Sequence, residues 1–176
     1  MASKWKKLSS AYVLETPWLS VRKDNYRTPQ RKAASDHYVV ERSNFIVVVL
    51  RTRNNKFILV RQYRCGAGRE IINFPMGFIE DGEQPREAAQ RELFEELGLQ
   101  VKGMKFLGSF LLAPTFTTMK GYVFAASHVG IPSRIGEDEI TDFVLMGSAQ
   151  VEKLLKKPGR TDFVTAVAYL LDKEAA

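Results

Sequence analysis

The order of hydrophobic and polar residues along the chain predicts a sheet built from several short strands. Residues 45–50 form an unbroken apolar run rich in β-branched side chains, which is typical of a strand buried on both faces. Asn54 and Asn55 then mark a turn, and residues 57–60 continue as the second strand of a hairpin. Similar patterns predict further strands at 11–14, 19–21, 38–40, 104–112, 121–126 and 143–146.

Three segments have helical periodicity instead. The first covers residues 84–98, where Pro85 suits the first helical position and Gly98 suits the left-handed residue after the last turn. Residues 149–155 and 162–171 are the other two. Because strands and helices interleave without strict alternation, we expect an α/β fold with a mixed sheet covered by helices.

Composition narrows the class of protein. The chain has 176 residues, 45% apolar and 26% charged, which suits a globular core and excludes wholesale disorder. No apolar run approaches the roughly 20 residues that a membrane span needs. The first residues lack a secretory signal, and a single cysteine cannot form an internal disulfide. We therefore expect a soluble cytoplasmic protein with no membrane partner.

The charge is unevenly distributed. The net charge is +6, yet residues 77–99 carry two basic and seven acidic residues, whereas residues 44–76 carry six basic and one acidic. A basic chain with one acidic segment favours a cation site whose surroundings attract a polyanion. The alternative is a solvated acidic helix, which is the usual origin of such a run.

The acidic segment places three carboxylates on one side of the predicted helix. Glu92, Glu95 and Glu96 fall within about 100° of one another on a helical projection. Ala88 and Ala89 lie one turn earlier and leave room for a ligand. Crowded carboxylates repel each other unless a cation joins them, and oxygen-only ligands favour Mg²⁺, with Mn²⁺ as the other candidate.

The complete stretch 77–99, GFIEDGEQPREAAQRELFEELGL, resembles the Nudix box, G-x5-E-x7-R-E-U-x-E-E-x-G-U with U apolar. This resemblance implies a Nudix α/β/α sandwich with a mixed sheet, plus an N-terminal antiparallel β-sheet extension. It divides the chain into residues 1–43, for dimerisation and substrate recognition, and residues 44–176, the catalytic domain. All fixed positions of the box match: Gly77, Glu83, Arg91, Glu92, Leu93, Glu95, Glu96, Gly98 and Leu99.

The resemblance also implies roles for these residues. Glu92, Glu95 and Glu96 would hold divalent ions and serve catalysis, together with the backbone carbonyl of Met76. Arg91 would pair with Glu83 and orient that face, since a planar guanidinium can hold a carboxylate by two contacts. Gly77, which has no side chain, would let its loop approach the metal closely.

Flanking residues resemble the branch that contains ADP-ribose pyrophosphatases and nucleoside diphosphate sugar hydrolases. Residues 62–64 read Gln-Tyr-Arg at a strand end, residues 75–77 read Pro-Met-Gly, and Pro114 follows the box. Arg64 is the candidate contact to substrate phosphate. Asn73 and residues 115–119 depart from the pattern of that branch, which leaves room for a broader range of nucleotide sugars.

Two aromatic positions are candidate nucleobase contacts by the same resemblance. Trp18 occupies the place of a stacking aromatic, with a core tryptophan as the alternative. His37 occupies the second stacking position, with an ordinary surface histidine as the alternative. In this branch a loop glutamate activates the water, and Glu139 fits that position best, with Glu137 as its rival.

These features predict metal-dependent hydrolysis of the pyrophosphate bond of ADP-ribose and related nucleoside diphosphate sugars. The branch also implies a homodimer formed through the N-terminal region. One alternative substrate class is dinucleoside polyphosphates or capped RNA, although no interleaved arginine and aromatic pattern for RNA is visible. A second alternative is a non-catalytic nucleotide-sugar sensor.

Overall fold

The computed structural model describes residues 5–28, 34–136 and 139–175. The chain divides into two compact units. The first contains Met1–Asn44 and Phe110–Lys120, and the second contains Phe45–Ser109 and Gly121–Ala176. Residues 110–120, which the sequence analysis placed with the catalytic domain, join the first unit through backbone hydrogen bonds. Val40 donates to the Phe116 carbonyl at 2.8 Å and accepts from Thr118 at 3.2 Å.

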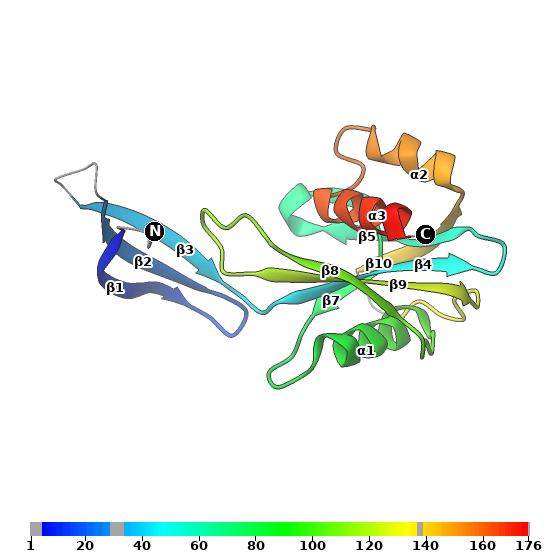
Figure 1. Ribbon diagram of the computed structural model, residues 1–176, viewed down its shortest axis with the longest axis horizontal. Helices are drawn as coiled ribbons and strands as arrows, with labels where there is room; N and C mark the ends of the chain where they lie inside the picture. The colour runs from blue at the N-terminus through cyan, green and yellow to red at the C-terminus, as the bar shows by residue number, and fades with distance from the viewer. Residues whose placement is uncertain (1–4, 29–33, 137–138, 176) are drawn as a thin grey trace. The chain divides into compact units, whose positions relative to one another are not determined.

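The first unit is built on a three-stranded antiparallel sheet in the order β1-β2-β3 (Figure 1). The strands are β1 (Lys6–Glu15), β2 (Ser20–Arg27) and β3 (Ser35–Glu41). This confirms the predicted N-terminal antiparallel sheet, with longer strands than the sequence pattern indicated. Every residue of β1 is exposed, so among the described residues this edge strand is left open to solvent.

A buried carboxylate stabilises this sheet. Asp24 on β2 is fully buried and accepts hydrogen bonds from Ser10 Oγ at 2.6 Å and Arg22 Nε at 2.9 Å, while Lys7 Nζ lies 3.0 Å away. Arg22 also contacts Glu41 on β3. Burial alone would raise the pKa of Asp24, but the bonds from Ser10, Lys7 and Arg22 outweigh it and lower the pKa to about 2. The ionised carboxylate therefore holds β1 and β2 together.

The second unit is built on a seven-stranded mixed sheet. Its main order is β10-β5-β4-β9-β8, with β6 paired to β5 and β7 paired to β4. Strand β4 runs antiparallel to β5 and β7 and parallel to β9, as a mixed sheet requires. The strands are β4 (Phe45–Thr52), β5 (Phe57–Arg64), β6 (Arg69–Asn73), β7 (Met76–Phe78), β8 (Lys105–Leu111), β9 (Lys120–Val129) and β10 (Ile140–Met146).

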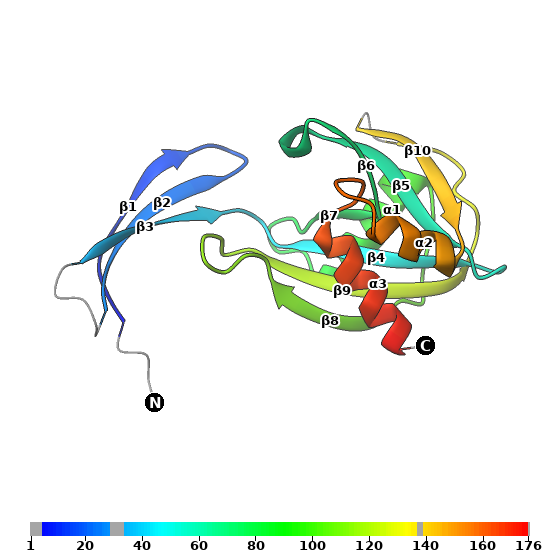
Figure 2. The ribbon, with the colours of Figure 1, turned by 90° about the horizontal axis from the view of Figure 1, so that it is seen from above.

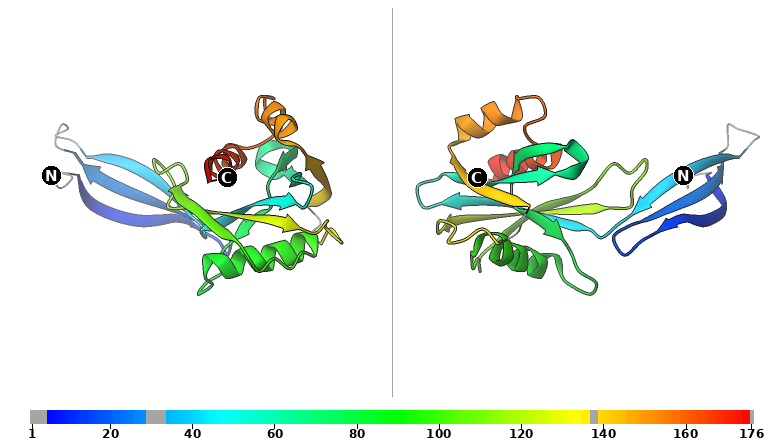
Figure 3. Two further views of the ribbon diagram at one scale, coloured as in Figure 1. Left: turned by 45° about the vertical axis from the view of Figure 1, so that its right-hand side comes forward. Right: turned by 180° about the vertical axis from the view of Figure 1, so that it is seen from behind.

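Helices cover both faces of this sheet, which confirms the predicted α/β/α sandwich. Helix α1 (Pro85–Leu97) lies on one face, and α2 (Ser148–Leu155) and α3 (Phe163–Ala175) lie on the other (Figures 1 and 3). Figure 2 shows α2 beside β10 and α3 across β4 and β9. The short β6 and β7 escaped the sequence analysis, because three to five residues give too little alternation to recognise.

Alternation along the central strands separates the two faces. On β4, Ile46 and Val48 join the apolar cluster that includes Leu93 of α1. On β5, Phe57 points to the opposite face, where its ring lies 5.4 Å from that of Tyr169 on α3. Within the described ranges, no helix is both long and apolar enough to cross a bilayer.

Replacing Asp24 by asparagine should destabilise the first unit by about 1–3 kcal/mol, because two cations then lose a buried carboxylate. Hydrogen exchange of the β1–β3 amides, followed by mass spectrometry, would measure the change. The contribution of Asp24 should be fully present above its ordinary pKa of 3.8 and be lost as the pH falls toward about 2.

Asp36→Asn is the matched control, since Asp36 is exposed and pairs with Lys23 at 2.8 Å on the same sheet. An exposed pair contributes less than about 1 kcal/mol. Equal protection losses in the two variants would contradict a special role for Asp24.

Candidate active site

Helix α1 begins and ends where its sequence predicts. Pro85 is its first residue, and the Glu87 carboxylate accepts a hydrogen bond from the Gln84 backbone N–H at 3.1 Å. Gly98 follows the last turn with φ 66°, a left-handed conformation that glycine adopts without strain. These ends fix the register that turns the acidic residues toward β7 and the apolar residues toward the sheet.

Arg91 contacts three of the four glutamates at fixed positions of the box. Its Nε and Nη2 donate to the two carboxylate oxygens of Glu83 at 3.0 and 2.9 Å. Its Nη1 donates to Glu92 at 2.9 Å and to Glu95 at 3.0 Å, and Nη2 also reaches the Phe78 carbonyl at 2.9 Å. One guanidinium therefore ties α1 to the preceding loop and to β7.

These contacts shift the ionisation of both partners of the closest pair. The Arg91 guanidinium lowers the pKa of Glu83 below its ordinary value. The Glu83 carboxylate in turn raises the pKa of Arg91. Both groups consequently stay charged at neutral pH.

The three candidate metal ligands differ in exposure. Glu96 is only 1% exposed and Glu92 only 7%, whereas the Glu95 side chain is 47% exposed. Across the part of the chain that the structure describes, no three acidic, histidine or cysteine side chains converge closely enough to hold an ion. In this arrangement, the cation between Glu92 and Glu95 is Arg91.

Gly77 brings the backbone of β7 against the carboxylate of Glu92. Strand β7 pairs with β4 so that Gly77 lies opposite Ile46 and Met76 opposite Val47. A Cβ atom built on Gly77 would lie 1.9 Å from the Glu92 carboxyl carbon and 2.1 Å from one oxygen. The missing side chain thus leaves space for an oxygen cluster beside the Met76–Gly77 backbone. A hard divalent ion fits this donor chemistry.

A loop that the sequence analysis did not identify closes the C-terminal end of α1. Arg134 donates to the Phe94 carbonyl at 2.9 Å, and its guanidinium lies 4.9 Å from the Phe94 ring centroid. Gly136 N–H donates to the Glu96 carbonyl at 3.0 Å. Its Cα packs so closely that a Cβ would lie 1.8 Å from the Glu95 carbonyl oxygen. These bonds satisfy carbonyls that a helix end leaves open.

The same loop leads to the candidate base. Glu139 is 62% exposed at its side chain, and its Oε2 lies 4.0 Å from Arg64 Nη1. Its carbonyl accepts a hydrogen bond from the Tyr63 N–H at 3.0 Å, which fixes Glu139 to the end of β5. The structure therefore brings Arg64 and Glu139 together. Glu137 lies outside the described residues.

The two candidate nucleobase contacts lie in the first unit. Trp18 is 77% exposed, which rules out the alternative of a core tryptophan. His37 is half-buried, and its ring lies 5.5 Å from Tyr26 and 5.7 Å from Trp5. Trp18 thus offers an open ring face, whereas His37 belongs to an aromatic cluster.

Gly77→Ala should displace the Glu92 carboxylate and lower divalent-metal-dependent hydrolysis by about tenfold or more, because a misplaced ligand weakens metal catalysis. The melting temperature should change little, since a side-chain end can rotate away. Gly103→Ala is the control, because a Cβ atom at that position would meet nothing within 4 Å. Unchanged activity in Gly77→Ala would contradict the close approach.

Comparison with known proteins bears on the family to which the chain belongs. A model of the NUDIX domain matches residues 40–167, and one of the nucleoside diphosphate sugar hydrolase N-terminal domain matches residues 5–40. An ADP-ribose pyrophosphatase of Bacillus subtilis is 31% identical over 147 residues, covering 81% of this chain and 80% of the relative. A methanol dehydrogenase activator of Bacillus methanolicus is 28% identical, covering 98% and 92%.

A crystal structure of an ADP compounds hydrolase superimposes with a TM-score of 0.85. The match covers 99% of this chain and 95% of that structure, at 24% sequence identity, and supports the fold. Nudix hydrolases generally need a divalent metal ion. From the matched domain, the complete box and the α/β/α sandwich together, the chain belongs to the Nudix hydrolase family.

Proposed function

We propose that this protein hydrolyses the pyrophosphate bond of ADP-ribose and related nucleoside diphosphate sugars. The products are a nucleoside monophosphate and a sugar phosphate. The observation that carries the proposal is the pair of buried carboxylates on α1, Glu92 and Glu96. Glu92 accepts a hydrogen bond from Arg91 and lies against Gly77 of β7, and all of these residues occupy fixed positions of the Nudix box. The N-terminal domain match and the Bacillus subtilis relative support the choice of substrate.

The site suits a divalent ion, for which we propose Mg²⁺, with Mn²⁺ able to replace it. Glu92, Glu95 and Glu96, with the Met76 carbonyl, are the proposed ligands. When bound, the metal neutralises phosphate charge and lowers the pKa of water. Glu92 and Glu95 would then exchange contacts with Arg91 for contacts with the ion, while Glu83 keeps Arg91 in place through its two hydrogen bonds.

Residues outside the helix would bind the substrate and move the proton. Arg64 is the last residue of β5. Its side chain points to the same face of the sheet as Val60, which packs in the α1 layer, because the two positions are four residues apart. The planar guanidinium can hold two phosphate oxygens. Glu139, 4.0 Å from Arg64, would accept the proton of the attacking water. The exposed ring of Trp18 would stack on the nucleobase.

Product analysis by ion-exchange chromatography tests the proposal. With Mg²⁺ and ADP-ribose, we expect AMP and ribose 5-phosphate in equal amounts, and related nucleotide sugars should be cleaved at the same bond. Cleavage of only capped RNA or dinucleoside polyphosphates would overturn the substrate. Calorimetric binding of ADP-ribose without turnover would indicate a sensor instead.

Two variants test the roles of individual residues in the same assay. Glu96→Gln should lower kcat by a factor of about 10² or more, because a buried ligand loses its charge. Glu139→Gln should lower kcat while the Mg²⁺ concentration for half-maximal rate stays unchanged, since Glu139 acts on water. If Glu137→Gln is the more damaging change, Glu137 is the base.

We also propose that a second copy of this chain covers the N-terminal sheet. Strand β1 is a ten-residue edge strand with every residue exposed, and long free edges are ready templates for pairing. Large apolar side chains lie exposed on it or directly before it in the chain: Trp5, Leu8, Tyr12, Val13 and Leu14. Such a patch on a folded chain indicates an interaction surface.

Sedimentation equilibrium of the full chain should therefore give a dimer. Val13→Lys should weaken association by at least about tenfold. Val13 is 55% exposed in the single chain, and in the proposed dimer a lysine at this position would bury a charge where an apolar side chain makes the contact. Ser9→Lys adds the same charge at an exposed polar position of the strand and should be milder. A monomeric wild-type chain would contradict the proposal.

A further inference from the structure

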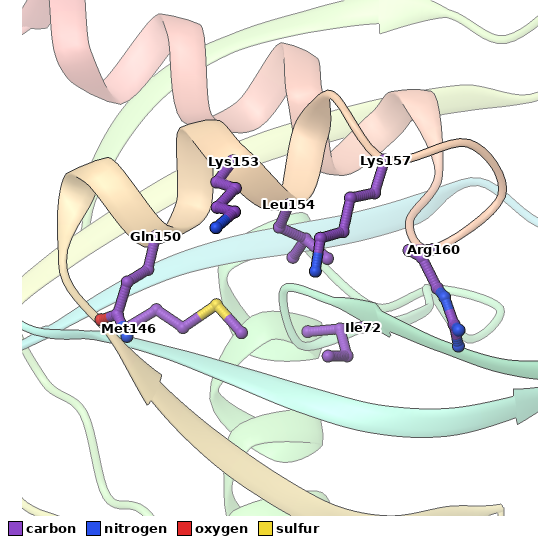
Figure 4. Close-up of a pocket in the computed structure, with 7 residues that line it drawn as sticks. All are labelled: Ile72, Met146, Gln150, Lys153, Leu154, Lys157 and Arg160. Carbon is purple, nitrogen blue, oxygen red and sulfur yellow. The ribbon is translucent and has the colours of Figure 1, made fainter.

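A cavity of about 420 Å³ lies under α2, away from the glutamates of α1. Figure 4 shows its walls, which come from β6, β10, α2 and the loop that follows α2. Its volume lies in the range of small-molecule sites, roughly 300–1,000 Å³. The residues that line it are Ile72, Met146, Gln150, Lys153, Leu154, Lys157 and Arg160.

Strand register places this cavity on the sheet face opposite α1. Met146 pairs with Phe57, whose ring packs on α3, and paired residues of neighbouring strands point to the same face. Ile72 pairs with Arg61, which alternates in phase with Phe57. The floor of the cavity therefore belongs to the α2–α3 layer, and the sheet separates it from Glu92 and Glu96.

The charged part of the lining is entirely basic. Lys153 extends from α2, and Lys157 and Arg160 extend from the following loop toward the same space (Figure 4). None of the described lining residues is acidic. Across the described part of the chain, no ion pair involves Lys153, Lys157 or Arg160. The Arg69 guanidinium lies beside Gly159, the residue before Arg160, because a Cβ atom built on Gly159 would be 2.3 Å from Arg69 Nη2. The cluster is therefore open to an anion.

A favourable helix dipole explains only part of this cluster. Lysines near the end of α2 would stabilise its C-terminus without any ligand. Arg160 and Arg69 lie outside α2, however, and the backbone fixes Arg160, because its carbonyl accepts from Ile72 N–H at 2.9 Å. Basic groups from α2 and from the loop after it thus line one apolar floor.

We propose that this cavity binds a nucleoside monophosphate, at a site separate from the catalytic one. Lys157 and Arg160 hold the phosphate by charge-assisted hydrogen bonds, with Lys153 beside them. The apolar floor of Ile72, Met146 and Leu154 receives the planar base, and a methionine sulfur packs well against an aromatic ring. A free phosphate or a bare nucleoside satisfies only half of the site.

Methionine methyl NMR can separate this cavity from the catalytic site. In protein labelled at the methionine methyl groups and kept in EDTA, Met146 reports on the cavity and Met76 on the neighbourhood of Glu92. Met146→Leu assigns the first signal. We expect AMP to shift the Met146 signal saturably, and ribose 5-phosphate and adenosine to bind at least about tenfold more weakly, since each lacks one half of the ligand.

The double variant Lys157→Ala/Arg160→Ala should weaken AMP binding at Met146 by at least about tenfold while kcat stays unchanged. Lys156→Ala, compared with the single variant Lys157→Ala, is the matched control, because it removes one lysine charge from the adjacent position without touching the lining. A shift at Met76 alone, equal binding of ribose 5-phosphate, or equal loss in Lys156→Ala would each overturn the proposal. None of these outcomes depends on whether ADP-ribose is hydrolysed.

Discussion

The acidic face of α1 depends on the hydrogen bonds of the Arg91 guanidinium to Glu83, Glu92 and Glu95. Glu83 and, on the second half of α1, Glu92, Glu95 and Glu96 are the glutamates at the fixed positions of the box, and like charges at such spacing repel. By contacting Glu83, Glu92, Glu95 and the Phe78 carbonyl, one planar cation lets the helix fold with its acidic face intact. A lysine, with a single point charge, could not make these contacts in one plane. The protein thus carries within this face a counterion of its own, the Arg91 guanidinium.

The sheet imposes the second constraint. Side chains of β4 and β5 alternate between the α1 layer and the α2–α3 layer, so neighbouring residues serve different surfaces. Arg64 and Glu139 therefore meet at one strand end on the α1 side, while Ile72 and Met146 floor the basic cavity on the other. One sheet supports two chemically unlike surfaces, an acidic one that suits cations and a basic one that suits anions.

Much of this could be predicted from the sequence. The helix ends at Pro85 and Gly98 and the β4–β5 hairpin follow from local rules, because capping and turn residues act over a few positions. The loop contact of Gly136 with α1 could not, since it joins residues 40 positions apart and depends on a missing side chain. Nor could the basic cavity, because Lys153 and Arg160 are brought to Ile72 and Met146 only by tertiary packing of α2 and the loop after it.

The bonds from the 133–136 loop to the last turn of α1 have a mechanical consequence. Arg134 and Gly136 hold this loop against the carbonyls of Phe94 and Glu96 in α1. Further along the chain, the Glu139 carbonyl accepts a hydrogen bond from the Tyr63 N–H of β5. Arg134 and Glu139, only five positions apart, are thus tethered to the helix and to the sheet respectively, and this short covalent connection limits how far α1 can slide along β5.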